Sequence, residues 1–271
     1  MRRWVFGALG IAVLVIWAFP VYWMAVTAFK PGREMFAVPP RLLPANPTLA
    51  NFGHVLSDGE FWRSAQNSLI VAACTVLAAM AFAFLASLAL ARFAFRGRRA
   101  LLVALIVVQM VPHVALVIPI FLTLGPLRLT DALPGLVISY LAFALPFAIW
   151  TLRGFVAGVP RDLEEAAMVD GCTRMGAFRR VVLPLIFPGL VATSIYTLIL
   201  AWNEYLLTYF LISSPEHYTL PLWLTHFITT EGTEYGPLMA GATLIATPVA
   251  VFFALVQRHL ARGLTAGAVK G

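Results

Sequence analysis

The sequence predicts an all-α membrane protein that crosses the bilayer six times. Of its 271 residues, 61% are hydrophobic and only 11% are charged, whereas a soluble globular protein has about 25% charged residues. Apolar runs of roughly 20 residues, the length that a helix needs to cross a bilayer, recur along the whole chain. We therefore expect residues 1–271 to form one transmembrane domain. The predicted spans are about 4–27, 66–91, 101–124, 133–152, 188–212 and 237–257.

The first span is preceded by Arg2 and Arg3, a start that also resembles a signal peptide. The small residues from Ala25 to Ala28 could then serve as a cleavage site. We favour an uncleaved helix, because the apolar run is longer than a usual signal-peptide core and five further spans follow it. Prolines inside the later spans are expected to kink or break the helices. They are Pro112, Pro119, Pro146 and Pro248.

The distribution of basic residues predicts that both termini are cytoplasmic. An even number of spans puts both termini on one side, and if that side is internal, fourteen Lys and Arg lie inside and five outside. This bias follows the positive-inside rule. The internal residues are Arg2, Arg3, Arg92, Arg96, Arg98, Arg99, Arg153, Arg161, Arg174, Arg179, Arg180, Arg258, Arg262 and Lys270. The external residues are Lys30, Arg33, Arg41, Arg63 and Arg128. Cytoplasmic loops, and not nucleic-acid binding, then explain the net charge of +7.

Two external segments and one internal loop are large. The proline-rich segment 30–65 is predicted to be irregular, with a short helix near Asn51–Leu56. Segment 213–236 combines acids with aromatic residues expected to be exposed, among them Tyr218, Trp223, Phe227 and Tyr235, and has no Lys or Arg. We expect it to contact an external protein, and the alternative is a loop that only packs on the rest of this chain. The longest internal segment is the loop 153–187, and a cytoplasmic tail of residues 258–271 follows the last span.

The internal loop 153–187 predicts a short acidic helix. Pro160 can begin it, because a missing N–H costs nothing there, and Asp162, Glu164 and Glu165 lie where the helix dipole favours acids. Gly171 can end it in a left-handed conformation, and a second helix is expected from about Arg174 to Pro184. One face carries Leu163, Ala166, Ala167 and Asp170.

The same loop carries a spaced pattern. Glu165-Ala166-Ala167 is followed by three residues, Gly171, nine residues, and then Val181, one residue and Leu183-Pro184. This pattern resembles the cytoplasmic loop by which permease subunits of bacterial ABC importers bind their ATPase subunits. The alternative is an ordinary solvated helix between two spans. The resemblance implies the type I permease fold of ABC importers. It also implies ATPase contacts by Leu163, Glu164, Glu165, Ala166, Ala167, Asp170 and Gly171.

The last nine residues resemble the C-terminal tail of carbohydrate-type ABC permeases, the group that includes the maltose importer. Asn67-Ser68-Leu69 and Trp202-Asn203-Glu204 match the same group. The resemblance implies that the tail reaches between two ATPase subunits, although a frayed terminus is the simpler alternative. The tail residues concerned are Gly263, Thr265, Gly267, Lys270 and Gly271.

Polar residues inside the predicted spans suggest a path for the solute. Glu204 is the only acid within a span, and a charge there is costly and points to function. With Trp202, Asn203 and Tyr205 it offers the polar groups and rings that bind sugars, while a packing hydrogen bond between helices is the alternative. In some relatives the sugar contacts lie mainly in the other permease subunit. Weaker path candidates are Gln109 and Tyr140.

The function expected from these features is import of a sugar across the bacterial cytoplasmic (inner) membrane. The chain lacks the G-x-x-x-x-G-K-[ST] motif, so ATP and Mg²⁺ are expected to be used by two partner ATPase subunits. The other expected partners are a second homologous permease, an external solute-binding protein, the sugar and membrane lipid.

The sugar class stays open between a di- or oligosaccharide and a glycerol phosphate. No cluster of intramembrane cations is present, which favours a neutral sugar. A self-sufficient secondary transporter or channel is the alternative. Such a protein would need ion- or proton-coupling groups within the membrane, and Glu204 alone is weak evidence for them. A membrane enzyme is disfavoured, because the chain shows no catalytic constellation and no metal-ligand spacing, and Cys74 and Cys172 form no motif.

Overall fold

The chain is almost entirely helical. Its computed structural model describes the backbone of residues 2–268 and the side chains of residues 6–7 and 9–255. Among these residues, five helices are long and apolar enough to cross a bilayer, or six if one strongly bent pair counts as a single span. The expected all-α membrane fold is confirmed. The long helices are α1 (Arg2–Ala28), α4 (Gly59–Arg92), α7 (Leu133–Gly158), α10 (Leu183–Trp202) and α13 (Tyr235–Ala268).

The third predicted span is a broken helix. It consists of α5 (Arg98–Gln109) and α6 (His113–Leu124), which meet at 103°. Pro112 stands at the N-cap of α6, and a proline disfavours helical conformation in the residue before it. The expected break is thus confirmed at Pro112. Pro119, Pro146 and Pro248 instead lie inside α6, α7 and α13.

The fifth predicted span, 188–212, is not one helix. Helix α10 ends at Trp202, and a separate short helix, α11 (Leu206–Leu211), follows. The Glu204 carboxylate accepts hydrogen bonds from the backbone N–H groups of Leu207 and Thr208. A side chain that binds the first free N–H groups of a helix favours a new start at that point. The expectation of a continuous helix through Glu204 was therefore wrong.

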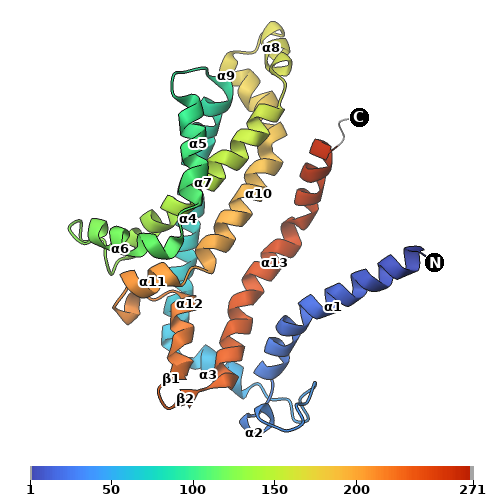
Figure 1. Ribbon diagram of the computed structural model, residues 1–271, viewed down its shortest axis with the longest axis vertical. Helices are drawn as coiled ribbons and strands as arrows, with labels where there is room; N and C mark the ends of the chain where they lie inside the picture. Colours follow the sequence, from blue (N-terminus) through green and yellow to red (C-terminus); the bar gives the residue numbers. More distant parts are fainter. Residues whose placement is uncertain (1, 269–271) are drawn as a thin grey trace. The chain divides into compact units, whose positions relative to one another are not determined.

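Residues 66–219 and 251–271 form one of two units. In it, α7 packs against α5 and α10, and α11 packs against α6 and α7. Figure 1 shows the two short helices α8 (Arg161–Val169) and α9 (Arg174–Ala177) at one end of α7 and α10, with α6 and α11 toward the other end. A π-helical turn, η1 (Phe178–Val182), joins α9 to α10, and η2 (Pro215–His217) follows α11.

Residues 1–65 and 220–250 form the other unit. Its short elements are α2 (Gly32–Met35), α3 (Ala50–Ser57), α12 (Leu220–Trp223) and η3 (Leu224–Phe227). Strands β1 (Ile228–Thr229) and β2 (Gly232–Thr233) form an antiparallel hairpin in which Ile228 lies opposite Thr233. The short helix expected near Asn51–Leu56 is confirmed as α3.

A buried aromatic cluster forms part of this unit's core. The Trp223 indole is fully buried, and its Nε1 donates to Asp58 Oδ2 at 2.9 Å. Its ring centroid lies 5.1 Å from that of Phe61 and 5.0 Å from that of Phe227. Trp223 and Phe227 were expected to be exposed for an external partner, and that expectation was wrong. Burial of their large apolar rings outweighs exposure, and the indole N–H is satisfied by Asp58.

Candidate functional site

The acidic helix α8 has well-defined ends. Pro160 is its N-cap, and Asp162 and Glu164 lie in its first turn, where the helix dipole favours carboxylates. At its other end, Gly171 N donates to Met168 O at 3.1 Å and Cys172 N donates to Ala167 O at 3.0 Å. This is the Schellman motif.

Gly171 completes that motif with a φ of +90°, so the predicted left-handed end is confirmed. A residue with a Cβ is strained in this conformation. The predicted helix end thus depends on a glycine at this position.

The second helix of the loop begins where it was expected. Thr173 Oγ1 accepts from Gly176 N at 3.1 Å, which caps α9 at Arg174. The helical path then continues through η1 into α10. The π turn lies just before Pro184, whose missing N–H cannot bond to the preceding turn. The loop 160–184 is therefore a closed helix–turn–helix unit and not an irregular connection.

Part of the loop 160–184 is apolar and exposed. Val169 is 87% exposed, and Leu163 and Met175 are also exposed large hydrophobics. Glu165, Ala166, Asp170 and Gly171 are exposed beside them, whereas Glu164 and Ala167 are half-buried. Exposed apolar side chains among charged neighbours are typical of a protein-binding surface.

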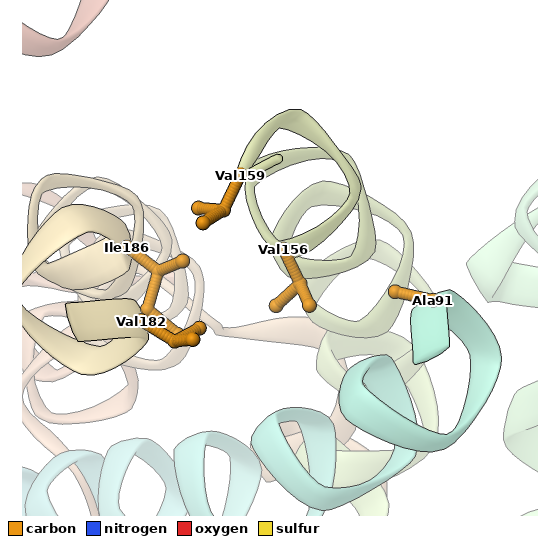
Figure 2. Close-up of a cluster of buried hydrophobic side chains, with 5 residues drawn as sticks. All are labelled: Ala91, Val156, Val159, Val182 and Ile186. Atoms are coloured by element: carbon orange, nitrogen blue, oxygen red, sulfur yellow. The ribbon is translucent and has the colours of Figure 1, made fainter. Parts of the chain in front are cut away.

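The base of the loop 160–184 is buried and packed. Figure 2 shows the side chains of Val156 and Val159 facing those of Val182 and Ile186, with Ala91 beside them. All five are buried. Close packing of this kind transmits displacement instead of absorbing it.

A glycine allows α7 and α10 to approach closely above this base. A Cβ at Gly189 would lie 2.3 Å from the Phe155 ring. The two helices that continue the loop into the membrane are thus in direct contact beside it.

The predicted path residues divide into a buried group and an exposed group. Tyr140 is fully buried, and its hydroxyl lies 2.7 Å from Thr208 Oγ1. Glu204 binds the α11 amides of Leu207 and Thr208 at 2.9 and 3.3 Å, and Trp202 is 8% exposed. These contacts favour the packing role for Tyr140 and Glu204.

Asn203 and Tyr205 are exposed beside the break between α10 and α11. The Asn203 amide donates to Ile199 O at 2.8 Å. Tyr205 has its ring centroid 5.7 Å from that of Tyr209. Their exposure leaves both side chains accessible from outside this chain.

Gln109 lines a pocket at the break between α5 and α6. The volume of the pocket is about 90 Å³. Stacked rings form part of its wall: His113 lies 4.2 Å from Phe143, and Phe147 lies 3.8 Å from Tyr196, between centroids. The lining residues are Val108, Gln109, His113, Ala142, Phe143, Pro146, Phe147, Tyr196 and Leu200.

The Gln109 side chain donates to Leu105 O at 2.9 Å, whereas two other polar side chains of this pocket have no hydrogen-bond partner among the described residues. The His113 ring and the Tyr196 hydroxyl make no hydrogen bond within the described part of the chain. Sequence reasoning missed both residues, because only the 103° break brings α5, α6, α7 and α10 around one space. The available signal was the presence of a His and a Tyr in apolar runs.

Asp131 holds two connecting segments together outside the predicted spans. Its Oδ1 accepts from the backbone N–H groups of Ser213 and Ser214, both at 2.9 Å, and its Oδ2 accepts from the Ser214 hydroxyl. Burial acts to raise the pKa of Asp131, but the bonds from Ser214 and Ser213 and the nearby His217 lower that pKa to about 2. The carboxylate is thus ionised at neutral pH and fixes the start of segment 213–236.

The tail residues are described only in part. The backbone of Gly263, Thr265 and Gly267 is helical within α13, while their side chains, and all of Lys270 and Gly271, lie outside the described residues. No group of three or more His, Cys, Asp and Glu side chains that could hold a metal ion occurs in the described part of the chain.

Comparison with known proteins gives one consistent family. Residues 79–266 match the family described as "Binding-protein-dependent transport system inner membrane component". The chain is 44% identical to the diacetylchitobiose uptake system permease protein DasC of Streptomyces coelicolor, over 100% of both chains. It is 37% identical to the trehalose transport system permease protein SugB of Mycobacterium tuberculosis, over 93% of this chain and 92% of that one.

A solved structure shares the fold. It belongs to a bacterial ABC transporter involved in the import of the acidic polysaccharide alginate. The TM-score is 0.77 and the identity 22%, over 95% of this chain and 97% of that one. At this identity the likeness is one of fold.

Proposed function

The chain belongs to the family of binding-protein-dependent transport system inner membrane components, and we propose that it forms one half of the transmembrane channel of a sugar importer driven by separate ATPase subunits. The observation that carries this proposal is the loop 160–184. It is a closed helix–turn–helix unit with an exposed apolar and acidic surface and a packed, buried base. Such a loop fits a docking element that passes movement from a soluble partner into membrane helices.

The ATPase contact is assigned to the exposed part of α8 and the turn that follows it. Leu163 and Val169 offer apolar contact area, and Glu165 and Asp170 offer charge. ATP and Mg²⁺ are assigned to the two ATPase partners. Both termini and the loop then lie on the cytoplasmic side, and the tail that contains Gly263 and Gly267 extends toward the same partners.

The solute is proposed to be a neutral disaccharide or short oligosaccharide. The named relatives transport diacetylchitobiose and trehalose, which favours this class over a glycerol phosphate. The pocket beside Gln109 combines ring faces with polar groups, as sugar sites do. Its volume of about 90 Å³ is below the roughly 300–1,000 Å³ of a whole ligand site, so it fits part of one sugar ring.

External contacts are assigned to the β1–β2 hairpin. Residues 228–232 are exposed, while the aromatic residues before them are buried and support the hairpin. One solved relative by fold is a transporter in complex with a periplasmic protein bound to alginate pentasaccharide. We assign the hairpin to an equivalent binding protein, and the exposed sides of the spans to lipid and to a second homologous permease.

Copurification tests the docking proposal. The tagged chain is coexpressed with the second permease and the ATPase, and the retained ATPase is quantified. Glu165→Arg should lower the amount of ATPase retained, because it reverses a charge on the exposed part of α8. Glu231→Arg on the hairpin is the matched control and should retain the wild-type amount. Equal retention by both variants, or failure of the wild-type chain to retain any ATPase, would contradict the assignment.

A further inference from the structure

Arg92 binds the end of helix α4 to the loop 160–184, the docking loop. The Arg92 guanidinium forms an ion pair with Glu164 of α8, and its Nη2 donates to the Val159 carbonyl at 3.1 Å. In return, Arg161 Nη2 donates to the Arg92 carbonyl at 2.9 Å. Three polar contacts thus join the last residue of α4 to the start of α8 and the residues just before it.

These contacts are shielded from solvent. The Arg92 side chain is 11% exposed and that of Glu164 is 20% exposed. Exposed ion pairs contribute little, because water and salt screen them, whereas this pair is largely buried and Arg92 adjoins the buried residues Ala91 and Val159. The Arg92 carbonyl also belongs to the last turn of α4, where backbone acceptors have no partner within the helix. Arg161 satisfies that acceptor.

A second contact joins the same end of α4 to α9. The Arg174 guanidinium carbon lies 5.6 Å from the centroid of the Phe93 ring, within the range of a cation–π interaction. Arg92 and Phe93 therefore bind both short helices of the loop. The covalent chain connects the loop only to α7 and α10, so α4 follows the loop through noncovalent contacts. These are the contacts of Arg92 and Phe93 and the packing of Ala91 in the buried base.

The two neighbouring glutamates of α8 have different surroundings. Glu164 is half-buried and bound to Arg92, whereas Glu165 is exposed. Successive residues on a helix point in directions about 100° apart, so one of them faces this chain while the other faces outward. Glu164 was expected to contact the ATPase, and its ion pair favours an internal role instead.

We propose that Arg92 is a positioning residue for coupling: it makes α4 move together with the docking loop when an ATPase displaces α8. This inference rests on the proposed function, since it presumes that a partner moves the loop. Three membrane helices, α4, α7 and α10, then respond to the ATPase, and the response of α4 depends on the Arg92–Glu164 pair.

The test uses the full complex in proteoliposomes with an excess of loaded binding protein. The readout is the number of ATP molecules hydrolysed per solute molecule imported. Arg92→Gln and Glu164→Gln should each raise this number roughly fivefold, the change in an equilibrium that about 1 kcal/mol of ion-pair energy produces. The double variant should be no worse than either single one, because both remove the same contact. Arg92→Lys keeps the charge and should recover part of the coupling.

Arg96→Gln is the matched control, because Arg96 is an exposed arginine in the same loop after α4. It should leave the ratio unchanged. Thermal unfolding of each complex is measured alongside. If Arg92→Gln lowers the unfolding temperature but leaves the ATP hydrolysed per solute unchanged, Arg92 has a purely structural role and the inference is overturned. The inference is also overturned if the effects of the two single variants on this ratio add in the double variant. If the wild-type complex imports no solute with ATP, the proposed function fails; if it imports normally and Arg92→Gln matches Arg96→Gln, only the coupling role of Arg92 fails.

Discussion

Replacing Glu204 with alanine removes the carboxylate that holds the first turn of α11. Its two oxygens accept from Leu207 N at 2.9 Å and Thr208 N at 3.3 Å. A hydrogen bond to a charged group contributes about 1.5–3 kcal/mol, and the longer of the two bonds lies beyond the usual range of 2.7–3.2 Å. Counting one full and one weak bond, we expect Glu204→Ala to lower the free energy of unfolding by about 2–3 kcal/mol.

Glu204→Gln separates the packing role from a role in the solute path. The amide keeps one oxygen, which can still accept from Leu207 N, so the expected loss is about 1 kcal/mol. Both variants are compared with Glu231→Ala, which removes an exposed carboxylate from the hairpin and should leave stability unchanged. Thermal unfolding and solute uptake are measured on the same assembled complexes.

The packing role predicts that the unfolding temperature is highest for wild type, lower for Glu204→Gln and lowest for Glu204→Ala. Solute uptake should then fall only in proportion to the amount of complex that assembles. This reasoning would be refuted if both variants lost solute uptake while their unfolding temperatures equalled that of the Glu231→Ala control. That result would make Glu204 a solute-contacting residue.

Three further predictions concern other parts of the chain. Gly171→Ala should weaken ATPase retention in copurification, because a Cβ at a φ of +90° strains the end of α8 by about 1–2 kcal/mol, while membrane insertion stays normal; full retention would contradict this. Asp131→Asn should lower the unfolding temperature at pH 7. The pKa of Asp131 is about 2 in the folded protein, against an ordinary value of 3.8. The difference in unfolding temperature between the variant and wild type should therefore be full above pH 4 and vanish as the pH falls through 2. A difference in unfolding temperature that persists below pH 2 would contradict this prediction. Deleting residues 263–271 should reduce ATP-driven uptake without loss of the permease from the membrane, whereas unchanged uptake would show that the tail makes no necessary contact.

Local sequence chemistry predicted the helix ends of the docking loop. Gly171 was identified because few other residues tolerate a left-handed helix end, and the start of α9 at Arg174 is fixed by the neighbouring Thr173 hydroxyl. Both features depend on residues within one turn of each other. The break at Pro112 was predictable for the same reason.

Features that depend on residues distant in the sequence were not predicted. Arg92 and Glu164 belong to different helices, and nothing local pairs them. The expected exposure of Trp223 was wrong, because its hydrogen-bond partner Asp58 lies far earlier in the chain and the local sequence does not reveal that contact. The break at Glu204 depends on neighbouring residues, because the carboxylate binds the N–H groups of Leu207 and Thr208. It was nevertheless missed, since the long apolar run around it favours one continuous helix.

ATP-driven uptake by the reconstituted complex tests the central claim most directly. Proteoliposomes contain this chain, its permease partner and the ATPase, and labelled disaccharide is supplied with its binding protein. We expect accumulation only with internal ATP and Mg²⁺ and only when the ATPase is present, and Glu165→Arg should reduce it. Accumulation driven by a proton or sodium gradient without ATPase would contradict the account and identify the chain as a self-sufficient transporter.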